Sequence, residues 1–106
     1  MTRTENSLLL YFETCAVDHR GLIAGSRING EDIAIAKGWN DSGFVRFGRI
    51  ASESLGKVHS GGQPATHWCR LSEDAWEKAH FIRRERAARM EDSLNLPKVI
   101  RLGLDC

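Results

Sequence analysis

The sequence predicts a small α+β domain with two or three N-terminal helices, a β-hairpin and a C-terminal helix. Apolar residues recur at helical spacing before residue 43 and again after residue 72. Between these segments, aromatic and β-branched residues form compact runs typical of strands, and glycine-rich stretches separate the elements. A chain of 106 residues holds one modest core. We expect a folded domain over residues 1–92 and a C-terminal extension over 93–106, either an edge strand or an arm.

The first helix is expected from about Glu5 to Arg20. Asn6 or Ser7 can cap its start, and Gly21 follows as a stop signal. The residues that recur on its main apolar face are Leu8, Phe12, Cys15 and His19. Leu10 and Val17 fall on a different face, so this helix is either central in the core or shared with a second subunit.

The second helix is expected to begin at Asn29, an N-cap residue followed by the acidic residues Glu31 and Asp32. It ends in the turn cluster of residues 40–43. The connection before it, residues 21–29, is either irregular or an abbreviated strand. If a third N-terminal helix exists, it must be a very short one between Leu22 and Ile28.

The second half of the sequence predicts the hairpin and the last helix. Residues 44–50 and 66–71 are expected to be strands, and residues 51–65, with Gly56, Gly61, Gly62 and Pro64, a flexible loop. Ser72 then caps a helix that continues to about Met90 and is rich in arginine in its last turns.

Charge is distributed unevenly along the chain. Residues 1–45 contain four Lys and Arg against six Asp and Glu, whereas residues 46–90 contain nine against five. The second half is therefore the candidate surface for an anionic partner. The alternative is a solvated basic helix in which pairs such as Glu85 with Arg89 support the helix.

The sequence favours a binding protein over an enzyme. It contains no Gly-x-Ser-x-Gly, P-loop or dinucleotide-binding motif. His67 and Cys69 would face the same side of a strand, which is the one geometric opening for catalysis. The cysteines show neither a disulfide framework nor paired metal-ligand spacing, so we expect no metal and no cofactor. The apolar stretch of residues 8–12 is too short for a signal peptide or a membrane span, and we expect a cytoplasmic protein without a membrane partner.

The stretch from Trp39 to Ala79, about two-fifths of the chain, resembles the wing region of winged-helix DNA-binding domains, MarR-like regulators in particular. The residues that carry the resemblance are Ser42-Gly43-Phe44-Val45-Arg46, the loop through Gly61-Gly62, and Trp68-Cys69-Arg70-Leu71-Ser72-Glu73-Asp74-Ala75. The chain departs from the family in showing two clear helices before the wing where three are usual. A protein of this kind would be a small bacterial or phage transcriptional regulator or accessory factor.

This resemblance implies double-stranded DNA as the partner. The helix over residues 30–40 would enter the major groove, with Lys37 and Asn40 reading bases. Contacts to the phosphate backbone would come from Arg46, Arg49, Lys57 and His59, and Gly61 and Gly62 would let the wing tip approach a phosphate. Arg84, in the arginine-rich helix end, is a further candidate for phosphate contact.

The alternative is a protein–protein adaptor on the same scaffold that does not bind DNA. Trp68 and Phe81, with flanking arginines, have a composition enriched at the centres of interfaces. Phe81 lies off the main stripe of its helix, and together with Leu10 and Val17 it suggests a homodimer interface.

Overall fold

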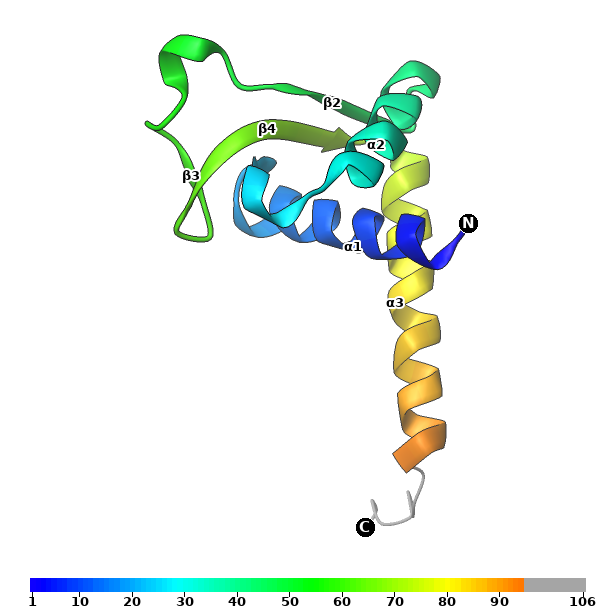
Figure 1. The fold of residues 1–106 in the computed structure, drawn as a ribbon. Helices are drawn as coiled ribbons and strands as arrows, with labels where there is room; N and C mark the ends of the chain where they lie inside the picture. Colours follow the sequence, from blue (N-terminus) through cyan, green and yellow to red (C-terminus); the bar gives the residue numbers. More distant parts are fainter. Residues whose placement is uncertain (95–106) are drawn as a thin grey trace.

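The structure is a computed structural model that describes residues 1–94 (Figure 1). Within these residues the α-helices are α1 (Arg3–Asp18), α2 (Gly30–Ser42) and α3 (Glu73–Leu94), and the strands are β1 (Leu22–Ala24), β2 (Val45–Arg49), β3 (His59–Ser60) and β4 (Gln63–Leu71). Single 3₁₀ turns occupy Gly25–Arg27 and Ser52–Ser54. The α+β class is therefore confirmed. Residues 93 and 94 still belong to α3, and the rest of the expected extension lies outside the described residues.

The first helix begins earlier than expected. Thr2 caps it, because its side chain accepts a hydrogen bond from the Glu5 amide while the Glu5 carboxylate accepts one from the Thr2 amide, at 3.1 and 2.8 Å. This reciprocal arrangement is a capping box. Asn6 and Ser7, the caps expected from the sequence, instead lie inside the first turns of α1.

The sheet is built around β4. Strands β1 and β2 flank β4 in antiparallel pairing, giving the order β1-β4-β2, and the short β3 pairs with the first residues of β4. The stretch 51–65, expected to be a loop, thus contains β3 and the start of β4. Gly61 and Gly62 both have positive φ, at 61° and 84°, and make the two-residue turn between these strands.

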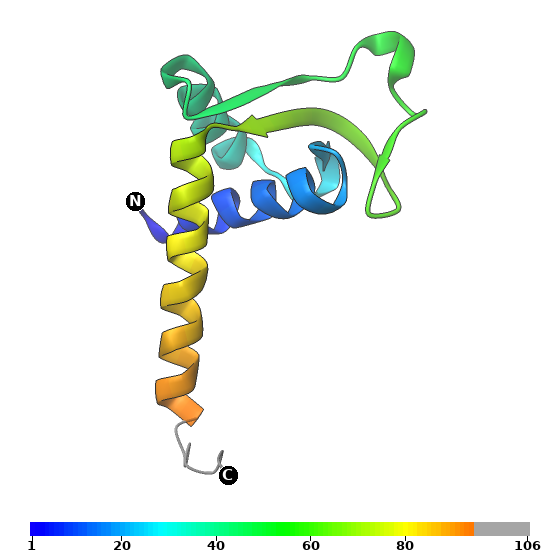
Figure 2. The same ribbon diagram turned by 180° about the vertical axis from the view of Figure 1, so that it is seen from behind.

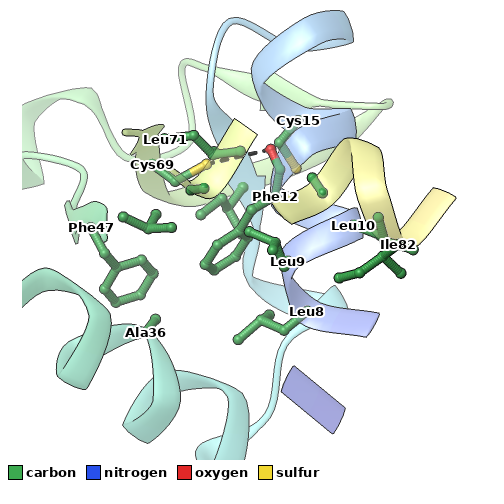
Figure 3. Packing of buried hydrophobic residues seen from close by; sticks show 14 residues of the cluster. Leu8, Leu9, Leu10, Phe12, Cys15, Ala36, Phe47, Cys69, Leu71 and Ile82 are labelled. Carbon is green, nitrogen blue, oxygen red and sulfur yellow. Dashed lines mark hydrogen bonds between the residues drawn. The ribbon is translucent and has the colours of Figure 1, made fainter. Parts of the chain in front are cut away.

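The core lies between the sheet and α1. The strand residues Val45, Phe47, Cys69 and Leu71 form what we call the inner face of the sheet. Phe12 of α1 is fully buried beneath it, and its ring centroid lies 5.9 Å from that of Phe47 (Figure 3). The Phe12 centroid also lies 6.2 Å from that of Trp39 on α2. Helices α1 and α2 therefore share one apolar core with the inner face.

Gly21 allows the chain to turn from α1 into β1. Its φ of 81° is in the left-handed region, and a Cβ atom at this position would lie 2.6 Å from the carbonyl oxygen of Cys69. The Gly21 carbonyl in turn accepts a hydrogen bond from the Cys69 amide at 2.8 Å. Glycine is required here for two reasons, the backbone conformation and the close approach of β4.

Helix α3 docks on α1 through a buried carboxylate. Glu13 is only 5% exposed and is paired with Arg83 and with His80, whose Nε2 lies 3.3 Å from the Glu13 carboxylate. Arg83 also donates to the Thr14 hydroxyl at 3.2 Å and to the Leu10 carbonyl at 3.4 Å. One guanidinium thus joins three residues on one face of α1 to α3.

The second half of α3 extends beyond the rest of the domain (Figures 1 and 2). All residues from Arg83 to Arg89 are exposed, and the ion pairs within the described residues involve only Glu13, His80 and Arg83. The expected pair of Glu85 with Arg89 is therefore not formed. None of the helices in the described part of the chain is long and apolar enough to cross a bilayer.

Candidate nucleic-acid interface

Helix α2 presents a narrow face of small and polar residues to solvent. Its start and end are those expected, because Asn29 and Asp32 form a capping box and Gly43 takes a φ of 82° just after the last turn. The exposed positions of this face are Gly30, Glu31, Ala34, Lys37, Gly38 and Asp41. Lys37 is the one cation among them, so any strong attraction to phosphate must come from a neighbouring element.

Asn40, expected to read bases, has a structural role at the end of α2. Its side-chain oxygen accepts a hydrogen bond from the Phe47 amide at 3.1 Å, and its carbonyl accepts one from the Arg46 guanidinium at 3.5 Å. These contacts fix the end of α2 against β2. Of the two expected reading residues, Lys37 is therefore the one whose side chain makes no hydrogen bond or ion pair within the part of the chain that the structure describes.

The two arginines of β2 lie on opposite sides of the sheet. Arg49 alternates with the buried Val45 and Phe47, so it lies on the inner side of the sheet. Unlike those two residues it is exposed, because it lies past the end of the core. Arg46 lies on the other side, which we call the outer face and which comprises Arg46, Gly48, Trp68 and Arg70. The structure therefore separates two residues that the sequence analysis placed in one contact surface.

The loop between β2 and β3 adds Lys57, and the first residue of β3 adds His59; both are exposed. In Figure 1 this loop projects from the end of the sheet, past the end of α1. Together with Arg49 they form what we call the hairpin cations: Arg49, Lys57 and His59. None has a carboxylate within the 4.0 Å limit for an ion pair among the described residues.

The remaining expected site residues are not part of this surface. Gly61 and Gly62 form a turn that lies near the His19 ring, since a Cβ on Gly61 would be 3.6 Å from it, and they do not mark a free tip. Arg84 lies on α3, which leaves the domain on the side away from the hairpin loop (Figures 1 and 2). Leu10, expected at a partner interface, is 7% exposed and packs in the core near Ile82 (Figure 3).

The other interface candidates are accessible. Val17, Trp68 and Phe81 are 66%, 38% and 45% exposed. Sequence reasoning missed two further exposed arginines, Arg20 and Arg70. Strict alternation along β4 was the available signal for Arg70, because it places residues 68 and 70 on the same face.

His67 and Cys69 do not form a thiolate–imidazole pair. The Cys69 thiol donates to the Phe12 carbonyl at 3.7 Å, and burial raises its pKa to about 12. The His67 ring stacks on Phe47 and is hydrogen-bonded to the Thr66 hydroxyl at 2.8 Å, and burial lowers its pKa. Among the side chains that the structure describes, those of residues 1–89, no group of three or more His, Cys, Asp or Glu is placed to hold a metal ion.

The raised pKa values of Cys69 and of the partly buried Tyr11 predict a loss of stability at high pH. The pKa of Cys69 rises from 9.0 to about 12 and that of Tyr11 from 10.0 to about 12, both mainly through burial. The folded chain therefore holds these protons more tightly, so stability is full below pH 9 and falls as the pH rises toward 12. Urea unfolding should show a slope of about 1.4 kcal/mol per pH unit for each group. A Cys69→Ala variant should have a shallower slope, and equal slopes in the two proteins would contradict the assignment.

Comparison of the chain with protein-family models, with curated proteins and with solved structures finds no match in any of the three.

Proposed function

We propose that this chain is a small DNA-binding domain that contacts duplex DNA through α2 and the hairpin loop. The observation that carries the proposal is the set of hairpin cations, which are exposed, lack carboxylate partners within the described residues and lie on or beyond the end of the sheet whose inner side α2 covers. Phosphate contact requires exposed cations without acidic partners, and groove insertion requires an accessible helix such as α2.

The order of elements supports the same interpretation. A helix, a short strand, a second helix and then a hairpin, with β4 central in the order β1-β4-β2, is similar to the winged-helix layout. In place of the usual second of three helices the chain has only the 3₁₀ turn Gly25–Arg27. The winged-helix assignment is thus part of the proposal.

The exposed face of α2 suits close contact with DNA. An α-helix about 10–12 Å in diameter fits a major groove about 12 Å wide. Ala34 and Gly38 keep the middle of this face low, which would let Lys37 reach base edges. Glu31 and Asp41 bracket the face and oppose phosphate. Most of the affinity should therefore come from the hairpin cations, with strong salt dependence.

The test is a double variant matched for charge. Arg49→Ala/Lys57→Ala should weaken binding to every duplex sequence and reduce the slope of log affinity against log salt by about 2. The control, Arg84→Ala/Arg86→Ala, removes the same charge from α3 and should leave the slope unchanged. Equal losses in the two variants would show that only net charge matters, and would remove the hairpin from the site.

A second candidate function is a protein–protein adaptor, with a homodimer as one form of it. The large apolar side chains of Val17 and Phe81 are 66% and 45% exposed, which is the specific observation that favours it. An adaptor predicts no duplex binding even at low salt. Sedimentation of the native chain against a Val17→Ser/Phe81→Ser variant would show whether these side chains join two copies.

A further inference from the structure

An open hollow of about 530 Å³ lies where the end of α1, the strand β4 and the first turns of α3 meet. Figure 2 shows these elements, with α3 in front of α1, and none of the lining residues belongs to α2. The side chains that give it its chemistry are Arg20, Trp68, Arg70 and Trp76. Its volume is within the range of small-molecule sites, about 300–1,000 Å³.

The lining of the hollow is cationic and aromatic. None of its lining residues is acidic, and neither Arg20 nor Arg70 has a carboxylate within 4.0 Å among the described residues. Gly48 leaves room for the Trp68 ring, because a Cβ atom at position 48 would lie 2.7 Å from the indole. The ring therefore lies over the β2 backbone with one part exposed to solvent.

Each of the two arginines is held at the hollow in an arrangement that is unfavourable for folding. Arg70 is directly opposite Arg46 in the pairing of β4 with β2, and like charges in that position repel each other. Arg20 has a φ of 58°, the one positive φ outside glycine in the described chain. That conformation is unfavourable for an arginine and cheap for a glycine. A bound anion would offset both costs.

We propose that this hollow binds a nucleotide unit, with the base stacked on an exposed indole and the phosphate held by Arg20 and Arg70. Guanidinium groups bind phosphate through paired charge-assisted hydrogen bonds, and aromatic side chains stack unpaired bases with little sequence preference. The unit is either a free nucleotide or an unpaired nucleotide in a single strand, because both present the same base and phosphate.

The inference does not rest on the duplex-binding proposal. None of the hairpin cations lines the hollow, although His59 and Arg20 line a smaller neighbouring one. The proposals are therefore separated with Arg49 and Lys57 on one side and Trp68 and Arg70 on the other. Variants of one pair should leave binding at the other pair unchanged, so failure of either proposal can be recognised separately.

The test is calorimetric titration of the whole chain with adenosine monophosphate, with inorganic phosphate and adenosine as separate half-ligands. We expect saturable binding of the nucleotide and much weaker binding of either half. Arg70→Gln and Trp68→Leu should each weaken nucleotide binding about tenfold or more. Arg84→Gln, an exposed arginine on α3, should leave it unchanged. A short single-stranded oligonucleotide, titrated in the same way, distinguishes the sources: tighter binding per site than the mononucleotide indicates a strand.

The Arg20→Gly variant distinguishes a role of Arg20 in binding from a role in stability, because the two quantities should change in opposite directions. It should raise the melting temperature, because glycine adopts this φ without strain, and at the same time weaken nucleotide binding. The proposal is overturned if neither nucleotide probe binds, if Arg70→Gln binds as the native chain does, or if inorganic phosphate binds as tightly as the nucleotide.

Discussion

Replacing Phe12 by alanine is expected to lower the free energy of unfolding by about 3–5 kcal/mol, the usual cost of truncating a buried phenylalanine. Phe12 has no exposed surface and contacts both Phe47 of β2 and Trp39 of α2. Its removal leaves a cavity where α1, α2 and the sheet meet. Since small domains have about 5–15 kcal/mol of stability in total, this loss is a large fraction of it. Urea titration followed by circular dichroism measures the loss.

Val17→Ala is the matched control for this variant. Val17 lies five residues further along α1 and is 66% exposed, so truncation there should change stability by less than about 0.5 kcal/mol. Comparable losses at Phe12 and Val17 would mean that α1 does not face the sheet as described, or that Val17 is buried in an oligomer.

Replacing Arg83 by methionine should cost about 2 kcal/mol, because it leaves the buried Glu13 carboxylate with His80 as its one remaining ionic partner. The estimate is below the full cost of breaking a buried pair, since the Arg83 side chain is 49% exposed and water screens part of the interaction. Methionine retains much of the aliphatic bulk, so the loss reports on the charge. Urea unfolding provides the measurement.

Arg84→Met makes the same chemical change at the next residue, which has no carboxylate within 4.0 Å among the described residues. It should be nearly neutral. If the two variants were equally stable, the contact of Glu13 with Arg83 would not be what holds α3 against α1.

The elements with local signals could be predicted from the sequence. Asn29 and Gly43 bracket α2 closely, because a capping side chain and a left-handed glycine act within a few residues. The start of α1 was missed although Thr2 and Glu5 have the spacing of a capping box.

The features that depend on contacts between distant residues could not be predicted. Glu13 and Arg83 are 70 positions apart, and no local pattern in either helix indicates that they meet. The strand β3 and the start of β4 lie in a stretch whose glycines and Pro64 resemble a loop. They become strands because each pairs with the other across the turn at Gly61 and Gly62.

The sequence predicted which cations belong to the candidate surface, but it did not predict on which face of the sheet each one lies. The sequence identified the cations of residues 46–59, but the period of a strand places Arg46 and Arg49 on opposite faces. The turn after α1 brings Arg20 beside β4, which no local pattern in the sequence indicates. A sheet assembles its faces from several strands, so strand order has to be known before a surface can be defined.

The central claim is that this chain binds duplex DNA through phosphate contacts, and the most direct test is fluorescence anisotropy of a labelled random duplex. The titration is made with the native chain at about 50 and about 200 mM salt. With about three phosphate contacts, log affinity should fall with a slope near −2.7, a loss of about 40-fold over this range. Absence of binding at the lower salt would contradict the claim, and so would binding that does not change between the two salt concentrations.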